Sequence, residues 1–241
     1  MDKRGKLTLT GNAGYSPDRQ EHLADKFLAA QVDGLIIVSA DGGADVDTQV
    51  KRAGVPSVYV HNQPEDGQAP AVSADNEDAV QQAVAHLCSH GHTRIAFLAG
   101  PRDAGPVGRR HATWETAIAG TGAPLLRCEY SRAAAAALTE QLISEGTMPA
   151  ALITATDEQA IGVLAGARAH GLAVPKRLAV ISLDGTPDSA YTAPALTVTQ
   201  QPLEAMAAQA VDLLLGGETA VPPAVAPLVV RSSCGCEPTG L

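Results

Sequence analysis

Aromatic residues are scarce in this chain, and their scarcity limits the kind of core that it can build. Phe, Tyr and Trp make up 3% of the 241 residues, whereas hydrophobic residues as a whole make up 45%. The core must therefore consist mainly of Ala, Val, Leu and Ile, which suits helices packed on parallel strands better than an aromatic-rich β-sandwich. The length fits one large α/β domain or two lobes of about 100 to 130 residues.

Positive charge and long apolar runs are also scarce. The chain has 17 Lys and Arg against 26 Asp and Glu, a formal net charge of -9. Proteins neutralise nucleic-acid phosphates with Lys and Arg, so this composition predicts poor nucleic-acid binding by the chain alone. No apolar run reaches the ~18 residues of a membrane span, and no apolar segment follows the basic N-terminus as in a secretory signal. We therefore expect no membrane partner and a cytoplasmic location.

Cysteine is rare as well, which argues against a disulfide-stabilised fold. The four cysteines are Cys88, Cys128, Cys234 and Cys236. Their spacing is not that of a disulfide framework, and the C-x-C near the C-terminus is not the usual spacing of a zinc pair. Free, buried thiols in a reducing compartment are therefore expected.

A metal site on one helix is the other hypothesis that the cysteine and histidine positions raise. His86 and His90 are four residues apart and share a helix face, with Cys88 and His92 close in sequence. Cys88 lies off that face, however, Gly91 ends the helix, and no carboxylate completes the set. The sequence therefore predicts no metal and no other cofactor.

Apolar runs alternate with helical patterns along the chain. Strands are predicted at residues 6–10, 32–38, 55–61, 71–75, 95–99, 125–130, 150–155, 178–183, 196–200 and 228–231. Helices are predicted after residues 16, 75 and 109, and at residues 46–53, 133–145, 157–170 and 203–215. Strand, helix and strand in succession indicate parallel sheets with right-handed crossovers.

Polar residues follow several of these strands. In open parallel sheets ligands bind beyond the carboxyl ends of the strands. The candidates there are His61, Tyr130, Thr156, Asp157 and Asp184, with Arg110 delivered by the loop after Gly100.

These side chains suit a sugar or nucleoside-like ligand. Arg110 offers a planar fork of donors, Asp184 can accept from two neighbouring hydroxyls, and Tyr130 can stack on an apolar ligand face. Other interpretations stay open from the residues alone: Arg110 as a surface arginine, Tyr130 as a rim residue, and Asp184 as a turn residue before Gly185. Asp75 is expected to be a helix N-cap rather than a ligand contact.

Catalytic motifs are missing from the pattern. The chain has no G-x-G-x-x-G, no phosphate-binding G-x-x-x-x-G-K-[ST] and no G-x-S-x-G. No recognisable base stands beside a nucleophile, and His111 has no evident partner. We therefore predict that the chain is not an enzyme.

Taken together, several segments resemble a known family. V-D-G-L-I-I-V, S-A-D-N, H-L-C-S-H-G-H-T-R-I-A-F-L-A-G-P, P-A-A-L-I-T-A-T-D-E-Q-A-I-G and H-G-L-A-V-P-K-R-L-A-V-I-S-L-D-G occur in this order. They resemble the effector-binding core of LacI/GalR-type bacterial transcriptional repressors, and the resemblance runs from about residue 7 to residue 233. It implies an α/β fold of the type I periplasmic-binding-protein-like class, with two Rossmann-like lobes of parallel sheets joined by three crossovers.

The resemblance also implies site residues and lobe boundaries. By motif position, the effector-binding arginine falls on Arg110, the strand-end aspartate on Asp184, the stacking aromatic on Tyr130 and the crossover glutamine on Gln201. The crossovers would lie near residues 100, 200 and 215–227. One lobe would then comprise residues 1–100 and 201–225, and the other residues 101–200 and 226–241.

The chain departs from the family pattern at three places. Thr156 replaces the asparagine that often precedes the equivalent of Asp157, which affects ligand choice, and Thr113 replaces a glycine. The helix-turn-helix, the hinge helix and the first strand and helix of the first lobe have no counterpart in the sequence. This absence predicts a truncated form of a longer regulator or a misassigned start.

The resemblance therefore implies the effector-sensing domain of a homodimeric repressor. Its effector would bind between the lobes, and DNA would be contacted only through a headpiece outside this sequence. A sugar-binding protein of a transport system shares the fold and is the alternative, and an α/β enzyme is the third possibility.

Overall fold

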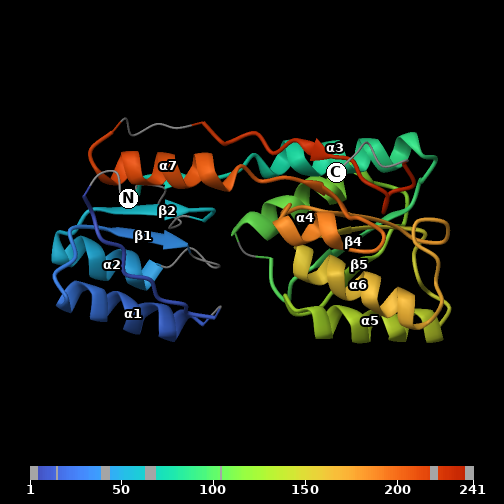
Figure 1. Ribbon diagram of the computed structural model, residues 1–241, viewed down its shortest axis with the longest axis horizontal. Helices are drawn as coiled ribbons and strands as arrows, with labels where there is room; N and C mark the ends of the chain where they lie inside the picture. The colour runs from blue at the N-terminus through green and yellow to red at the C-terminus, as the bar shows by residue number, and fades with distance from the viewer. Residues whose placement is uncertain are drawn as a thin grey trace. The chain divides into compact units, whose positions relative to one another are not determined.

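The computed structural model describes residues 5–14, 16–38, 44–62, 69–103, 105–217 and 222–236, and the chain forms two compact units (Figure 1). The first unit consists of Met1–Ala74, Ala104–Pro106 and Pro202–Ala224. The second consists of Asp75–Asp103, Val107–Gln201 and Val225–Leu241. Among the described helices, none combines the length and apolarity that a membrane span requires.

The first unit is a parallel three-stranded sheet with helices on both faces. Its elements are α1 (Pro17–Ala29), β1 (Leu35–Val38), α2 (Ala44–Ala53), β2 (Ser57–Val60), β3 (Ala71–Val72) and α7 (Leu203–Leu214), and the strand order is β1-β2-β3. Side chains alternate between the faces of a strand. Tyr59 packs with α1 and α2, whereas Val58 and Val60 pack with α7. The predicted α1 start is confirmed, with Ser16 as N-cap and Pro17 as first residue.

The predicted strand at residues 6–10 is wrong. These residues are described but belong to neither sheet, and Leu7 and Leu9 are 98% and 60% exposed. A strand is stable only when its backbone groups pair with a neighbour. Within the described residues β1 pairs with β2 alone, so the apolar pattern of 6–10 finds no ladder to join.

The second unit is a six-stranded sheet in the order β5-β4-β6-β7-β8-β9. Its elements are α3 (Asn76–Ser89), β4 (Ile95–Ala99), α4 (Gly105–Ala117), β5 (Leu125–Arg127), α5 (Arg132–Ser144), β6 (Ala151–Thr154), α6 (Asp157–Ala169), β7 (Ala179–Ser182), the 3-10 helix η2 (Pro187–Tyr191), β8 (Thr197–Thr199) and β9 (Leu228–Val229). All neighbours are parallel except β8 and β9, which are antiparallel.

Aliphatic side chains fill both faces of this sheet, as the scarcity of aromatics predicts. Ile95 and Phe97 of β4 pack with α3 and α4, and Ala96 and Leu98 pack with α5 and α6. The central strands are buried on both faces, which is why their sequences read as continuous apolar runs.

The prediction that β4 belongs to the sheet of the first lobe is wrong. β4 pairs with β5 and β6, with Ile95 opposite Ala151, and α3 belongs to the same unit. The chain therefore leaves the first unit between Ala74 and Asp75, not near Gly100. The apolar period identifies β4 as a buried strand, but it carries no information on which sheet the strand joins.

Candidate functional site

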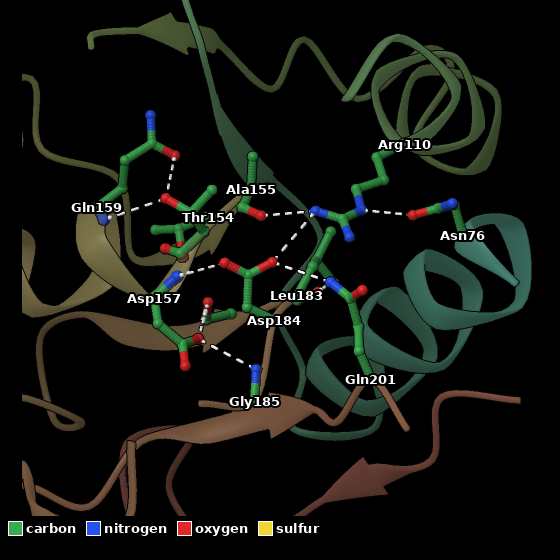
Figure 2. Close-up of polar contacts among 12 residues, drawn as sticks. Asn76, Arg110, Thr154, Ala155, Asp157, Gln159, Leu183, Asp184, Gly185 and Gln201 are labelled. Carbon is green, nitrogen blue, oxygen red and sulfur yellow. Dashed lines mark hydrogen bonds and ion pairs between the residues drawn. The ribbon is translucent and has the colours of Figure 1, made fainter. Parts of the chain in front are cut away.

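The carboxyl ends of β4, β6, β7 and β8 meet at one edge of the six-stranded sheet, because these strands are parallel. Six of the seven predicted site residues belong to this unit. Figure 2 shows the hydrogen bonds and the ion pair that join Arg110, Asp157, Asp184 and Gln201 at this edge. We call these four residues the carboxyl-edge cluster.

Arg110 is a buried cation held by three groups of its own unit. Its Nε donates to Asn76 Oδ1 at 2.7 Å and its Nη1 donates to the Ala155 carbonyl at 2.7 Å. Nη1 also lies 3.6 Å from Asp184 Oδ1. Because Arg110 is only 4% exposed, it is not the solvated surface arginine that the sequence left open.

Asp184 follows β7 and accepts hydrogen bonds from two other segments of the chain. Its Oδ2 accepts from the backbone N–H of Asp157 at 3.2 Å, and its Oδ1 accepts from Gln201 Nε2 at 3.0 Å. Gln201 also donates to the Leu183 carbonyl at 3.3 Å, which fixes its amide. Its Oε1 is buried and accepts no hydrogen bond among the described residues. An unsatisfied buried acceptor is unfavourable, so a hydrogen bond from a ligand to this oxygen would be stabilising.

Burial and charge oppose each other in the pair of Arg110 and Asp184. Burial lowers the pKa of Arg110, and Asp184 opposes that shift. Burial also raises the pKa of Asp184; Arg110 opposes this shift, and the charge of Asp157 reinforces it while the Asp157 N–H opposes it. Both shifts arise because the two charges are withdrawn from water. The side chain of Asp184 is 25% exposed and that of Arg110 is 5% exposed, so the carboxylate is the accessible member.

Asp157 lies at the start of α6, where its carboxylate is committed to the protein. It accepts from Ser182 Oγ at 2.5 Å, from the Thr186 N–H and Oγ1 at 2.6 Å each, and from the Gly185 N–H at 3.4 Å. The side chain is buried, so these bonds position the loop that carries Asp184. A direct contact of Asp157 with ligand stays a prediction.

Thr156 is the N-cap of α6. Its Oγ1 accepts from the Gln159 N–H at 3.3 Å, and the residue is half-buried. An N-cap hydroxyl satisfies one of the free N–H groups of the first helical turn. Its part in ligand choice, suggested by the family pattern, also stays a prediction.

Tyr130 lies beyond β5, with its ring against Gly100. A Cβ built on Gly100 would lie 2.0 Å from the Tyr130 hydroxyl, so any side chain at position 100 would displace the ring. Tyr130 is half-buried and acts electrostatically on Arg110. The structure thus places its ring near the carboxyl-edge cluster, and its stacking on a ligand stays a prediction.

His61, the seventh predicted residue, belongs to the first unit. It follows β2 with a φ of 69°, in the left-handed region that non-glycine residues rarely occupy. Such a conformation at a strand end is a feature of turns and of functional sites. The predicted ligand contact of His61 is not tested by the geometry of the second unit.

Three contributors to the site were missed from the sequence: Asn76, Gln159 and the Ala155 carbonyl. Gln159 is fully buried and donates from Nε2 to the Ala99 carbonyl at 3.0 Å and to the Cys128 carbonyl at 3.3 Å, which ties the ends of β4 and β5 together. The one available signal was Asn76 within the S-A-D-N segment. There Asp75 is the N-cap of α3, as predicted, and accepts from the Asp78 N–H at 3.0 Å.

Comparison with known proteins agrees with this architecture. A family model described as a periplasmic binding protein-like domain matches residues 84–234. The chain is 34% identical over 254 residues to the HTH-type transcriptional regulator MalR of Streptomyces coelicolor, a match that covers 93% of the chain and 73% of MalR. The chain belongs to the LacI/GalR family. The predicted fold class, two parallel-sheet units of the periplasmic-binding-protein-like type, is therefore confirmed.

Other LacI/GalR relatives support the same conclusion. The chain is 31% identical over 213 residues to catabolite control protein A of Priestia megaterium, which covers 86% of the chain but 64% of that protein. The solved complex of the transcriptional regulator CelR with cellobiose has a TM-score of 0.79 and 27% identity, and covers 96% of the chain and 75% of CelR. These relatives are regulators, in agreement with the prediction that the chain is not an enzyme.

Proposed function

We propose that this LacI/GalR-family domain binds a small polyhydroxylated effector, a sugar or a nucleoside, at the carboxyl edge of its six-stranded sheet. In the whole protein, binding would modulate the attachment of a helix-turn-helix headpiece to DNA. The chain spans 64% of the length of one curated relative and 73% of another, so DNA binding is proposed from those relatives. Their role in transcription also supports a cytoplasmic location.

The observation that carries the proposal is the pairing of an accessible carboxylate with a buried guanidinium. Asp184 is the more exposed partner of Arg110 and is already aligned by the Gln201 amide and the Asp157 N–H. A carboxylate accepts hydrogen bonds from two neighbouring hydroxyls, and a guanidinium donates to hydroxyl oxygens. Vicinal hydroxyls are the recurring group of sugars and riboses, and cellobiose in the CelR complex belongs to this class.

Effector binding would act on the regulator by shifting a conformational equilibrium. A ligand changes such an equilibrium only to the extent that it binds one state better than the other. The carboxyl-edge cluster draws residues from α4, from the segments after β7 and β8, and from the start of α6. A ligand held by these groups therefore constrains segments that are distant in sequence. The family resemblance adds a homodimer to the proposal, which sedimentation velocity over a range of concentrations would test.

Isothermal titration calorimetry with a panel of mono- and disaccharides and nucleosides tests the binding proposal. Asp184→Asn removes the accessible charge, and Arg110→Lys keeps a charge but loses the planar fork. We expect each to weaken binding of the effector by about 100-fold or more, since a buried partner is left poorly satisfied. Circular dichroism establishes that each variant is folded.

Arg132→Lys is the matched control. Arg132 is a half-exposed arginine of the same unit that pairs with Glu158 and Asp188, neither of which is a member of the carboxyl-edge cluster. We expect its effector affinity to match that of the unaltered chain. An effector whose affinity survives both Asp184→Asn and Arg110→Lys would show that this cluster is not the site.

A further inference from the structure

One histidine of α3, the histidine that caps this helix and two cysteines near the C-terminus converge on one point in the second unit. The four residues are His86, His90, Cys234 and Cys236, and we call them the histidine–cysteine cluster. Their nitrogen and sulfur atoms all lie within 4.8 Å of one another. The set contains two of the seven histidines and two of the four cysteines of the chain.

The distances within the cluster resemble the edges of a metal-ligand tetrahedron. His86 Nε2 lies 3.2 Å from Cys234 Sγ and 3.6 Å from Cys236 Sγ, and His90 Nε2 lies 3.2 Å from Cys236 Sγ. In tetrahedral zinc sites, metal bonds of about 2.3 Å to sulfur and about 2.0 Å to nitrogen place these ligands about 3.5 Å apart. These three nitrogen–sulfur distances are therefore close to those around one Zn²⁺ ion, and the remaining separations do not exceed 4.8 Å.

The backbone explains why the four side chains face one another. His86 lies in the last turn of α3 and His90 is the C-cap of that helix, four residues later, and their ring centroids are 4.8 Å apart. Cys234 and Cys236 flank Gly235, whose φ of 106° is a conformation that side chains rarely adopt. This glycine turns the chain so that both thiols face α3.

A buried serine, Ser233, fixes the turn at residues 234–236 to the sheet. The hydroxyl of Ser233 donates to the Val180 carbonyl at 2.6 Å and accepts from the Thr197 N–H at 2.8 Å. The Ser233 N–H donates to the Ala195 carbonyl at 3.0 Å. These bonds anchor the residue next to Cys234 to β7 and β8, so the thiols are held against a rigid part of the sheet.

A buried threonine supports one of the thiols. Thr197 Oγ1 accepts from the Arg231 N–H at 2.9 Å and donates to Cys234 Sγ at 3.1 Å. Because the Arg231 N–H occupies an acceptor position of the hydroxyl, its proton is directed toward sulfur. A hydrogen bond from a neighbouring residue to a metal ligand orients that ligand, and a bond donated to sulfur stabilises the thiolate.

Hydrogen bonds among the two imidazoles and the two thiols are too weak to explain why these four side chains lie so close together. Thiols are weak donors, and a neutral imidazole has a single N–H, so the cluster has few strong bonds to make internally. Both cysteines are free, with Cys234 1% exposed. Two imidazole nitrogens and two thiolates in tetrahedral array are typical of zinc sites.

We propose that the histidine–cysteine cluster binds one Zn²⁺ ion and thereby attaches residues 234–236 to α3. Cys88, the cysteine nearest to His86 and His90 in the sequence, is exposed on α3 outside the cluster. The two cysteines of the cluster lie 148 and 150 residues from His86. This site is independent of the proposed effector site, so neither depends on the other being correct.

Metal titration of the reduced, chelator-treated chain tests the site. We expect one equivalent of Zn²⁺ to bind in competition with a chromophoric chelator. Co²⁺ in its place should give the intense visible bands of a tetrahedral ion and a near-ultraviolet band from thiolate ligation. His90→Ala and Cys236→Ser should weaken Zn²⁺ binding by at least about 100-fold. Loss of a residue that only hydrogen-bonds to a metal ligand costs about 10- to 100-fold in affinity, and loss of a ligand itself should cost no less.

Cys88→Ser and His92→Ala are the matched controls, because each removes a potential ligand close to α3 but outside the cluster. Their Zn²⁺ affinity should equal that of the unaltered chain. His90 is exposed and Cys236 is half-buried, so both test variants are expected to fold, which circular dichroism checks. Three results would overturn the proposal: no stoichiometric Zn²⁺ binding, binding that survives both test variants, or a disulfide between Cys234 and Cys236 under reducing conditions.

Discussion

The two polar clusters described in the second unit differ in how strongly their members bind one another. In the carboxyl-edge cluster, Arg110, Asp157, Asp184 and Gln201 hold one another through charged and neutral hydrogen bonds. In the histidine–cysteine cluster, the side chains face one another at ligand spacing but share only weak contacts through sulfur. The first cluster is preorganised by the protein itself, whereas the second gains its main interaction from an ion. The two clusters should therefore respond to different perturbations.

Arg110→Met should produce the largest loss of stability. It removes the cation from Asp184 and the donor from Asn76 while it approximately keeps the side-chain volume. Breaking a buried charge pair by removing one partner costs about 3–5 kcal/mol. Urea denaturation measures the difference, with Arg132→Met as an exposed control whose loss of stability should be far smaller. A loss as small as that of the control would mean that the carboxyl-edge cluster is not preorganised.

Zinc should stabilise the chain by the next largest amount. At a free Zn²⁺ concentration of about 100 times the dissociation constant, linkage adds about 2.7 kcal/mol to the free energy of unfolding. Denaturation in metal-buffered solution and in chelator measures this difference. His90→Ala should abolish it, whereas Asp184→Asn should retain it. An equal effect of zinc on His90→Ala would contradict the contrast between the two clusters.

Thr156→Ala should cost about 1 kcal/mol, the usual value of an N-cap hydroxyl. The change removes the acceptor for the Gln159 N–H at the start of α6. Thermal denaturation measures the stability, and calorimetry on the same variant measures effector affinity. A loss of affinity without a loss of stability would assign Thr156 to the ligand and not to the helix.

The smallest effect concerns Asp103, which lies in the loop before α4. The Arg127 guanidinium, with a lesser contribution from His111, holds the pKa of this carboxyl below its ordinary value. A carboxyl with a lowered pKa adds stability above its unfolded pKa, and this contribution is lost as the pH falls through its folded pKa. Because the side chain is 39% exposed, Asp103→Asn should cost less than about 1 kcal/mol at neutral pH. The difference should vanish in unfolding experiments at progressively lower pH.

Local patterns explain what was predictable from the sequence. Arg110, Asp184 and Gln201 follow recognisable segments, and parallel strands bring their carboxyl ends to one edge whatever the side chains between them. Asn76 and the Ala155 carbonyl could not be found in this way, because their roles depend on where the buried Arg110 side chain points. That the two histidines and the two C-terminal cysteines meet could not be predicted, for a related reason. The two pairs lie at opposite ends of the second unit's sequence, and only the packing of the residues after β9 against α3 joins them.

In the first unit, a local sequence pattern predicts a strand that the structure does not contain at residues 6–10. Residues 6–10 carry a strand-like alternation, but a strand also needs a partner, which periodicity does not supply. The assignment of β4 to the wrong sheet has the same origin, since its burial on both faces fits the centre of either sheet. Local pattern thus predicts the elements, and long-range pairing decides their neighbours.

Trp114 gives the two units different optical signatures. It is the only tryptophan in the sequence, it is 3% exposed, and its indole N–H donates to the Ile95 carbonyl inside the second unit. Tryptophan fluorescence therefore reports the unfolding of the second unit, whereas far-ultraviolet circular dichroism reports the helices of both. Coincident transitions would show that the units unfold as one cooperative block, and a separation between them would measure the stability of the first unit by itself.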